Sequence, residues 1–68
     1  MTVRQIDVYR SAGVLQREHG DGAALEAAMR ADAMLDKGDM DGAALWRRIL
    51  AAVEELQRFE PGTGETLQ

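Results

Sequence analysis

Two similar tripeptides, His19-Gly20-Asp21 and Lys37-Gly38-Asp39, interrupt a chain that otherwise favours helix. A Gly just after a helix can adopt the positive φ that helix ends commonly need, and the Asp that follows can cap the next helix. Links as short as these place consecutive helices side by side. Strong helix formers dominate residues 23–58, and no stretch alternates with the period of a strand. The sequence therefore predicts an all-α fold: a short antiparallel three-helix bundle with tight Gly-Asp turns.

The apolar spacing sets the expected extent of each helix. We predict one helical domain and a flexible tail: a domain over 1–60 with helices at about 3–18, 22–37 and 40–59, and the tail over 61–68. The last helix carries two adjacent apolar stripes, which is more than the single face of an ordinary surface helix. It therefore needs cover on two sides, either from the other two helices or from one helix and a second chain.

The first two helices carry small residues that predict close packing. Gly13 costs its helix about 1 kcal/mol relative to Ala, and we expect the approach of a neighbouring helix to explain it. The second helix has a face of small residues, widened by two larger ones: Ala24, Ala28, Ala31 and Leu35, with Leu25 and Met29 beside them.

The core that such helices can build is thin. Ala supplies 11 of the 31 apolar residues, and each Ala buries little area. The chain has no Cys, so neither a disulfide nor a thiolate metal site adds stability. Domains of this size rarely gain more than about 3–5 kcal/mol from one core, and oligomerisation is the common remaining solution. We therefore expect a homo-oligomer, with a dimer favoured.

Charge and hydropathy argue against two classes of partner. The formal net charge is −4 and the sequence pI is about 4.7, which disfavours direct binding to nucleic acid or to an anionic membrane. No apolar run approaches the roughly 20 residues that span a bilayer, and the N-terminus lacks the apolar stretch of a signal peptide. We therefore expect a cytoplasmic protein that binds neither nucleic acid nor membrane.

The residues that could carry chemistry form no recognisable site. The single imidazole, His19, fits the last turn of a helix, where the helix dipole favours a cation. The acidic cluster around Asp39 resembles part of a calcium-binding loop, but Lys37 and Arg48 occupy the two ends of that motif. We predict no catalytic residue, no cofactor and no metal, so the chain is not expected to be an enzyme.

One local feature is typical of a protein–protein contact. The only Trp lies beside the only adjacent pair of Arg, and these residue types are the most enriched in interface anchors. The sequence therefore predicts a protein–protein interaction or regulatory module that acts through an apolar helix face with a basic rim. The candidate residues are Trp46, Arg47, Arg48, Ile49, Leu50 and Val53. The alternative, a core Trp flanked by two solvated Arg, stays open.

A different function fits the acidic residues. In this alternative the chain is an inhibitor or decoy that occupies a basic nucleic-acid-binding site on another protein. The carboxylates that would then matter are Asp32, Asp36, Asp39 and Asp41. Binding of that kind would fall steeply with salt, whereas apolar docking would not.

The pentapeptide Asp-Gly-Ala-Ala-Leu occurs twice, at residues 21–25 and 41–45. Similar helix starts are expected by convergence in an Ala-rich chain. An identical pentapeptide also fits a degenerate duplication, and both interpretations stay open.

Several short patterns resemble known families. The pairs His19-Gly20 and Gly38-Asp39, together with Gly42, Trp46 and the Leu-rich last helix, resemble a group of small uncharacterised alphaproteobacterial helical proteins across residues 8–57. That resemblance implies a bacterial three-helix fold and nothing about chemistry. The segment over residues 33–46, with its turn at Gly38-Asp39, is also similar to the inter-helix turn of tetratricopeptide repeats, which often read Gly-Asp followed by Ala, over that single turn.

Overall fold

The structure is a computed structural model that describes residues 4–59. Within that range all regular structure is helical: α1 (Gln5–His19), the 3-10 turn η1 (Gly20–Gly22), α2 (Ala23–Asp36) and α3 (Met40–Phe59). These bounds lie within two residues of the ranges expected from the sequence, and the all-α prediction is confirmed for this part of the chain. The tail predicted over 61–68 lies outside the described residues. None of the helices found there is long and apolar enough to cross a membrane.

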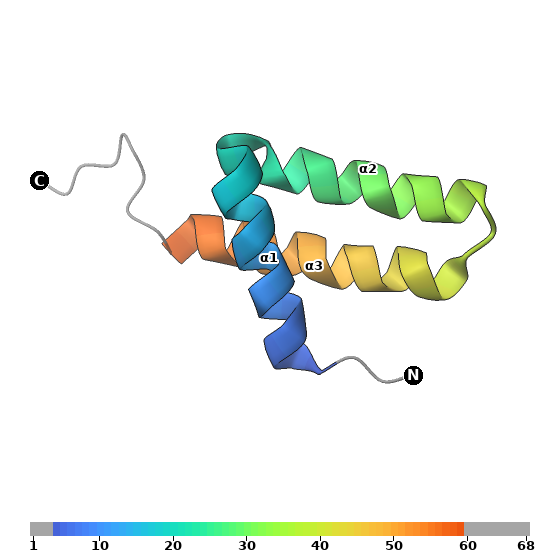
Figure 1. The fold of residues 1–68 in the computed structure, drawn as a ribbon, viewed down its shortest axis with the longest axis horizontal. Helices are drawn as coiled ribbons and strands as arrows, with labels where there is room; N and C mark the ends of the chain where they lie inside the picture. The colour runs from blue at the N-terminus through green and yellow to red at the C-terminus, as the bar shows by residue number, and fades with distance from the viewer. Residues whose placement is uncertain (1–3, 60–68) are drawn as a thin grey trace, which may run out of the picture.

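The helices α2 and α3 form an antiparallel hairpin, and α1 lies across it (Figure 1). The link between α2 and α3 turns through Gly38, whose φ is 79°. The link between α1 and α2 instead passes through Gly20, with φ 56° and ψ −127°, and then through η1. The direction in which the chain leaves α1 therefore differs from the direction in which it leaves α2. The side-by-side arrangement expected of consecutive helices describes α2 and α3, whereas α1 crosses them steeply.

Both turn glycines have the positive φ that the sequence predicts, but only one of the two Asp caps forms. Asp39 Oδ1 accepts a hydrogen bond from the backbone N–H of Gly42 at 2.8 Å, and so caps α3. No side chain caps the start of α2, and the cap predicted for Asp21 is wrong. The reason is position, because Asp21 lies inside η1 and Gly22 takes the N-cap place.

The core lies where α1 crosses the hairpin. The two apolar stripes of α3 are covered by α1 and α2, so the wide apolar surface of α3 is accommodated within one chain. The buried residues of α2 are all Ala, and the larger buried side chains come from α1 and α3. The buried cluster consists of Val8, Ala12, Leu15, Ala23, Ala27, Ile49, Ala52 and Val53.

Two packing details differ from what the sequence predicts. Leu25 and Met29 are 66% and 55% exposed, because the buried face of α2 is a narrow stripe of Ala. Gly13 does not mark a close helix contact: a Cβ added there would meet only Arg17 Nη1, at 4.0 Å. Packing inside the molecule therefore does not explain this glycine.

Candidate interaction surface

The apolar face predicted around Trp46 lies only partly at the surface. Ile49 and Val53 are 3% and 0% exposed and belong to the core, so they offer no surface to a partner. Leu50 is half-buried against the same core. Ile49 and Val53 are therefore not part of an exposed apolar face, contrary to the prediction. The physical reason is that α1 and α2 together cover both apolar stripes of α3.

Trp46 has a partner within its own chain. Its side chain is half-buried, and the guanidinium carbon of Arg30 lies 5.0 Å from the ring centroid, which is a cation–π geometry. Arg30 Nε also donates a hydrogen bond to Glu26 Oε2 at 2.7 Å. The cation that stacks on Trp46 thus comes from α2, and the contact holds the ring against the hairpin.

The same arginine controls the titration of Glu26. The hydrogen bond from Arg30 lowers the pKa of this carboxyl group, and the positive charges of Arg30 and His19 act in the same direction. Partial desolvation opposes them, but the pKa of Glu26 is still held below its ordinary value of 4.5. Glu26, Arg30 and Trp46 therefore form one cluster that joins α2 to α3.

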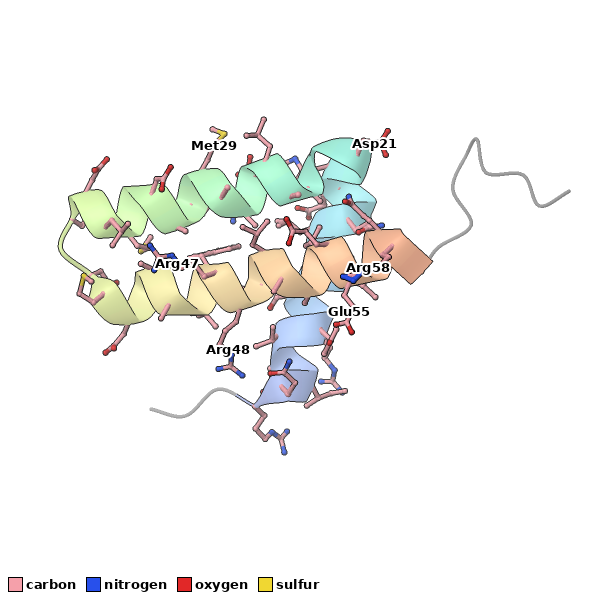
Figure 2. All side chains as sticks on the ribbon, turned by 180° about the vertical axis from the view of Figure 1, so that it is seen from behind. Asp21, Met29, Arg47, Arg48, Glu55 and Arg58 are labelled. Atoms are coloured by element: carbon pink, nitrogen blue, oxygen red, sulfur yellow. The ribbon has the colours of Figure 1, made fainter. Side chains whose placement is uncertain are left out.

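The two arginines that follow Trp46 are exposed, as predicted for the rim of an interaction surface. Arg48 Nη2 donates a hydrogen bond to Gln5 Oε1 at 2.7 Å, which links α3 to α1. Figure 2 shows Arg48 extending from α3 toward α1. Of the six predicted residues, Arg47 and Arg48 are exposed, and Trp46 and Leu50 are half-buried.

A contact that the sequence did not indicate joins α1 to α3. The Tyr9 hydroxyl donates a hydrogen bond to Glu55 Oε1. This hydrogen bond, with desolvation and the nearby negative charge, raises the pKa of Tyr9 above its ordinary value of 10.0. The two residues are 46 positions apart, so no local spacing could have paired them.

The four residues of the alternative function, Asp32, Asp36, Asp39 and Asp41, are all exposed. Asp32 and Asp36 are exposed on α2, whereas the Asp39 carboxylate is engaged in the cap of α3. Asp41 is exposed in the first turn of α3. The decoy function stays a prediction, and two of its carboxylates belong to the surface described next.

An exposed face with two large apolar side chains runs along α2. Its members are four exposed residues at intervals of four, three and four, here called the α2 outer face: Leu25, Met29, Asp32 and Asp36. Figure 2 shows Met29 pointing away from α3. The face pairs apolar side chains with carboxylates and contains no basic residue. An apolar patch with a polar rim is typical of a protein-binding surface.

The sequence contained the signal for this face, because Leu25 and Met29 lie one helical turn apart. Their helix was expected to bury them beside its Ala stripe. What was missing was the position of α1, which leaves that side of α2 uncovered.

No group of three or more His, Cys, Asp or Glu side chains in residues 4–59 is placed to hold a metal ion. Comparison of the chain with models of known protein families, with curated proteins and with solved structures gives no match. The chemistry of the chain's own surface is therefore what bears on its function.

Proposed function

We propose that the chain is a small non-enzymatic protein–protein interaction module that self-associates, with the α2 outer face as its docking surface. The observation that supports this proposal is the exposure of Leu25 and Met29, two large apolar side chains one helical turn apart. Fully burying such a side chain gains about 1.5–3 kcal/mol over leaving it exposed. A partner that covers both therefore adds a substantial favourable contribution.

The distribution of apolar residues in α2 strengthens the proposal. The buried residues of this helix are all Ala, while Leu25 and Met29 face outward. A chain of 68 residues with so small a core and no disulfide depends on further contacts, and oligomerisation commonly supplies them. A second copy of the chain is therefore the simplest partner.

The test is the mass of the protein in solution over a wide range of concentration, measured by sedimentation equilibrium. We expect the wild-type mass to rise above the 7.5 kDa of one chain as concentration increases. The double variant Leu25→Glu/Met29→Glu should stay monomeric, because two charges would have to be desolvated in the contact.

A matched control places the same two charges elsewhere. Ala44 and Ala51 are exposed on α3, and the variant Ala44→Glu/Ala51→Glu should associate like the wild type. Far-UV circular dichroism checks that each variant keeps its helices. A wild type that is strictly monomeric at high concentration overturns the proposal, and so does equal association of the two double variants.

A further inference from the structure

The helix α1 repeats the spacing of the α2 outer face with the opposite charge. Four residues of α1, separated by intervals of four, three and four, lie along one side of the helix and are called the α1 outer face: Ile6, Arg10, Gly13 and Arg17. The α2 outer face has an apolar pair followed by two acids at the same intervals. The α1 outer face has an apolar residue followed by two bases around a glycine.

The α1 outer face points away from the core. Arg10 and Arg17 are exposed, and Ile6 is 51% exposed. The buried residues of α1 occupy its other side: Val8, Ala12 and Leu15. Gly13 leaves the middle of the outer face without a side chain of its own, and it is half-buried. A Cβ added there would meet only Arg17 Nη1, at 4.0 Å, which belongs to a long and flexible side chain of the same face.

The exposed apolar residues concentrate on these two faces. The large apolar side chains exposed in the described part of the chain are Ile6, Val14, Leu25, Met29 and Met40. Three of them belong to the two outer faces, and Val14 borders the α1 outer face, one turn beyond Arg10. The surfaces that would gain most from being covered are therefore the same surfaces that carry opposite charge.

The charges decide which faces can meet. A parallel pairing of two α2 outer faces would oppose Asp32 and Asp36 with the same acids of the other copy, and like charges disfavour such a contact. An antiparallel pairing would place Leu25 against Asp36 and Met29 against Asp32, so neither pairing gives the acids a partner of opposite charge. The ion pairs seen in residues 4–59 include Arg4–Asp7 and Arg30–Glu26, and neither Arg10 nor Arg17 takes part in an ion pair within that range. Both arginines are thus available to a partner. The two outer faces point away from the core that joins their helices, so they cannot meet within one molecule.

We propose that the α1 outer face of one molecule docks on the α2 outer face of a second copy, with the two helices running in the same direction. This inference rests on the self-association proposed above. A parallel alignment places Ile6 against Leu25 and brings Arg10 and Arg17 beside Asp32 and Asp36. An antiparallel alignment of the same two faces would instead place Ile6 against Asp36. A single contact of this kind uses a different face of each copy and is heterologous, whereas two such contacts related by a two-fold axis would form a symmetric dimer.

Charge reversal tests which faces meet. One variant carries Arg10→Glu/Arg17→Glu and the other carries Asp32→Lys/Asp36→Lys, and all four positions are exposed. Each variant alone should associate about tenfold or more weakly than the wild type, because it opposes like charges. An equimolar mixture should associate again, since every contact between the two variants is then of opposite charge. Sedimentation equilibrium at low salt measures all three samples.

The quadruple variant is the matched control for net charge. It combines all four reversals in one chain and keeps the formal net charge of −4, because two Arg→Glu changes and two Asp→Lys changes cancel. It should associate like the wild type. The Asp32→Lys/Asp36→Lys variant has a smaller net negative charge than the wild type, so its weaker association could not come from overall repulsion.

A cysteine pair tests the direction of the helices, because the chain has no Cys of its own. Under oxidation, a mixture of the Ile6→Cys and Leu25→Cys variants should form a disulfide-linked dimer faster than a mixture of Ile6→Cys and Asp36→Cys. The reverse order overturns the parallel alignment. A self-associating wild type whose association the Arg10→Glu/Arg17→Glu change leaves intact, or a mixture of reversed variants that stays monomeric, overturns the pairing of the two faces. Neither result touches the α2 outer face as a docking surface, whereas a monomeric wild type overturns both proposals.

Discussion

The pentapeptide Asp-Gly-Ala-Ala-Leu stands at the start of both α2 and α3, yet its two copies begin their helices in different ways. In the first copy, Asp21 and Gly22 belong to η1 and α2 begins at Ala23 without a side-chain cap. In the second copy the helix has already begun at Met40, and Asp39 caps it from outside the pentapeptide. The residues around a motif therefore decide where its helix starts.

The two copies also differ in what they bury. The third residue, Ala23 or Ala43, is buried in both, whereas Leu25 is exposed and Leu45 is packed against the core. Two steps along a helix turn the side chain by about 200°. A helix with one narrow buried stripe must therefore expose the fifth residue when it buries the third. The helix α2 is of this kind. The helix α3 is covered on two sides, so it can pack both the third and the fifth residue of its copy against the rest of the molecule.

The glycines show how tightly each junction is built. A Cβ at Gly42 would lie 2.6 Å from Asp39 Oδ2 and 2.9 Å from Met34 Sδ, whereas a Cβ at Gly22 would meet nothing within 4 Å. The second copy therefore sits in a crowded junction between the end of α2 and the start of α3. In the first copy, Gly22 faces open space at the start of α2.

The largest difference between the copies should appear at their leucines. We expect Leu45→Ala to lower the free energy of unfolding by about 2 kcal/mol, the low end for a buried Leu, because this side chain is half-buried against the core. Leu25→Ala should change it by no more than about 0.5 kcal/mol. Urea unfolding of dilute protein measures both. Equal losses at the two positions would mean that Leu25 contributes to the core as much as Leu45 does.

The caps should give the next largest difference. Asp39→Ala removes the side chain that binds the Gly42 N–H, and we expect a loss of about 1 kcal/mol in the free energy of unfolding. Asp21→Ala, in the first copy, removes no cap and should leave stability nearly unchanged. Asp39→Asn keeps an N-cap acceptor and should recover most of the loss. A large effect of Asp21→Ala would mean that the two helix starts are more alike than their geometry indicates.

Local patterns in the sequence predicted the helices, both positive-φ glycines and the cap at Asp39, because each depends on residues a few positions apart. The width of the apolar surface of α3 also predicted that two elements must cover it. What local patterns could not give is the path of α1 across the hairpin, which depends on the backbone at Gly20. That path determines that Ile49 and Val53 are buried, that Leu25 and Met29 are exposed, and that Tyr9 meets Glu55.

The smallest expected effect concerns Glu26 and Trp46, the residues that directly follow the two copies. Arg30 joins them, because it donates a hydrogen bond to Glu26 and stacks on the ring of Trp46. The pKa of Glu26 is lowered in the folded chain, chiefly by the hydrogen bond from Arg30. A group with a lowered pKa stabilises the fold above its ordinary pKa and loses that contribution as the pH falls through the lowered value. We therefore expect the wild type to lose stability on acidification partly through this carboxylate, and Glu26→Gln to remove that part.

The measurement is urea unfolding from neutral pH into the acidic range, together with an NMR titration of the Glu26 carboxyl carbon. Arg30→Gln is the partner variant, because it removes the donor and should return the Glu26 midpoint toward 4.5. If acid instead destabilises the wild type and Glu26→Gln equally, the hydrogen bond between Arg30 and Glu26 does not stabilise the fold. Arg30 would then stabilise it only through its stacking contact with Trp46. Because the pair lies at the surface, its effect should be smaller than those of Leu45 and Asp39. A smaller effect here also fits a cluster in which Arg30 stacks on the Trp46 ring and so joins α2 to α3 just beyond the second copy.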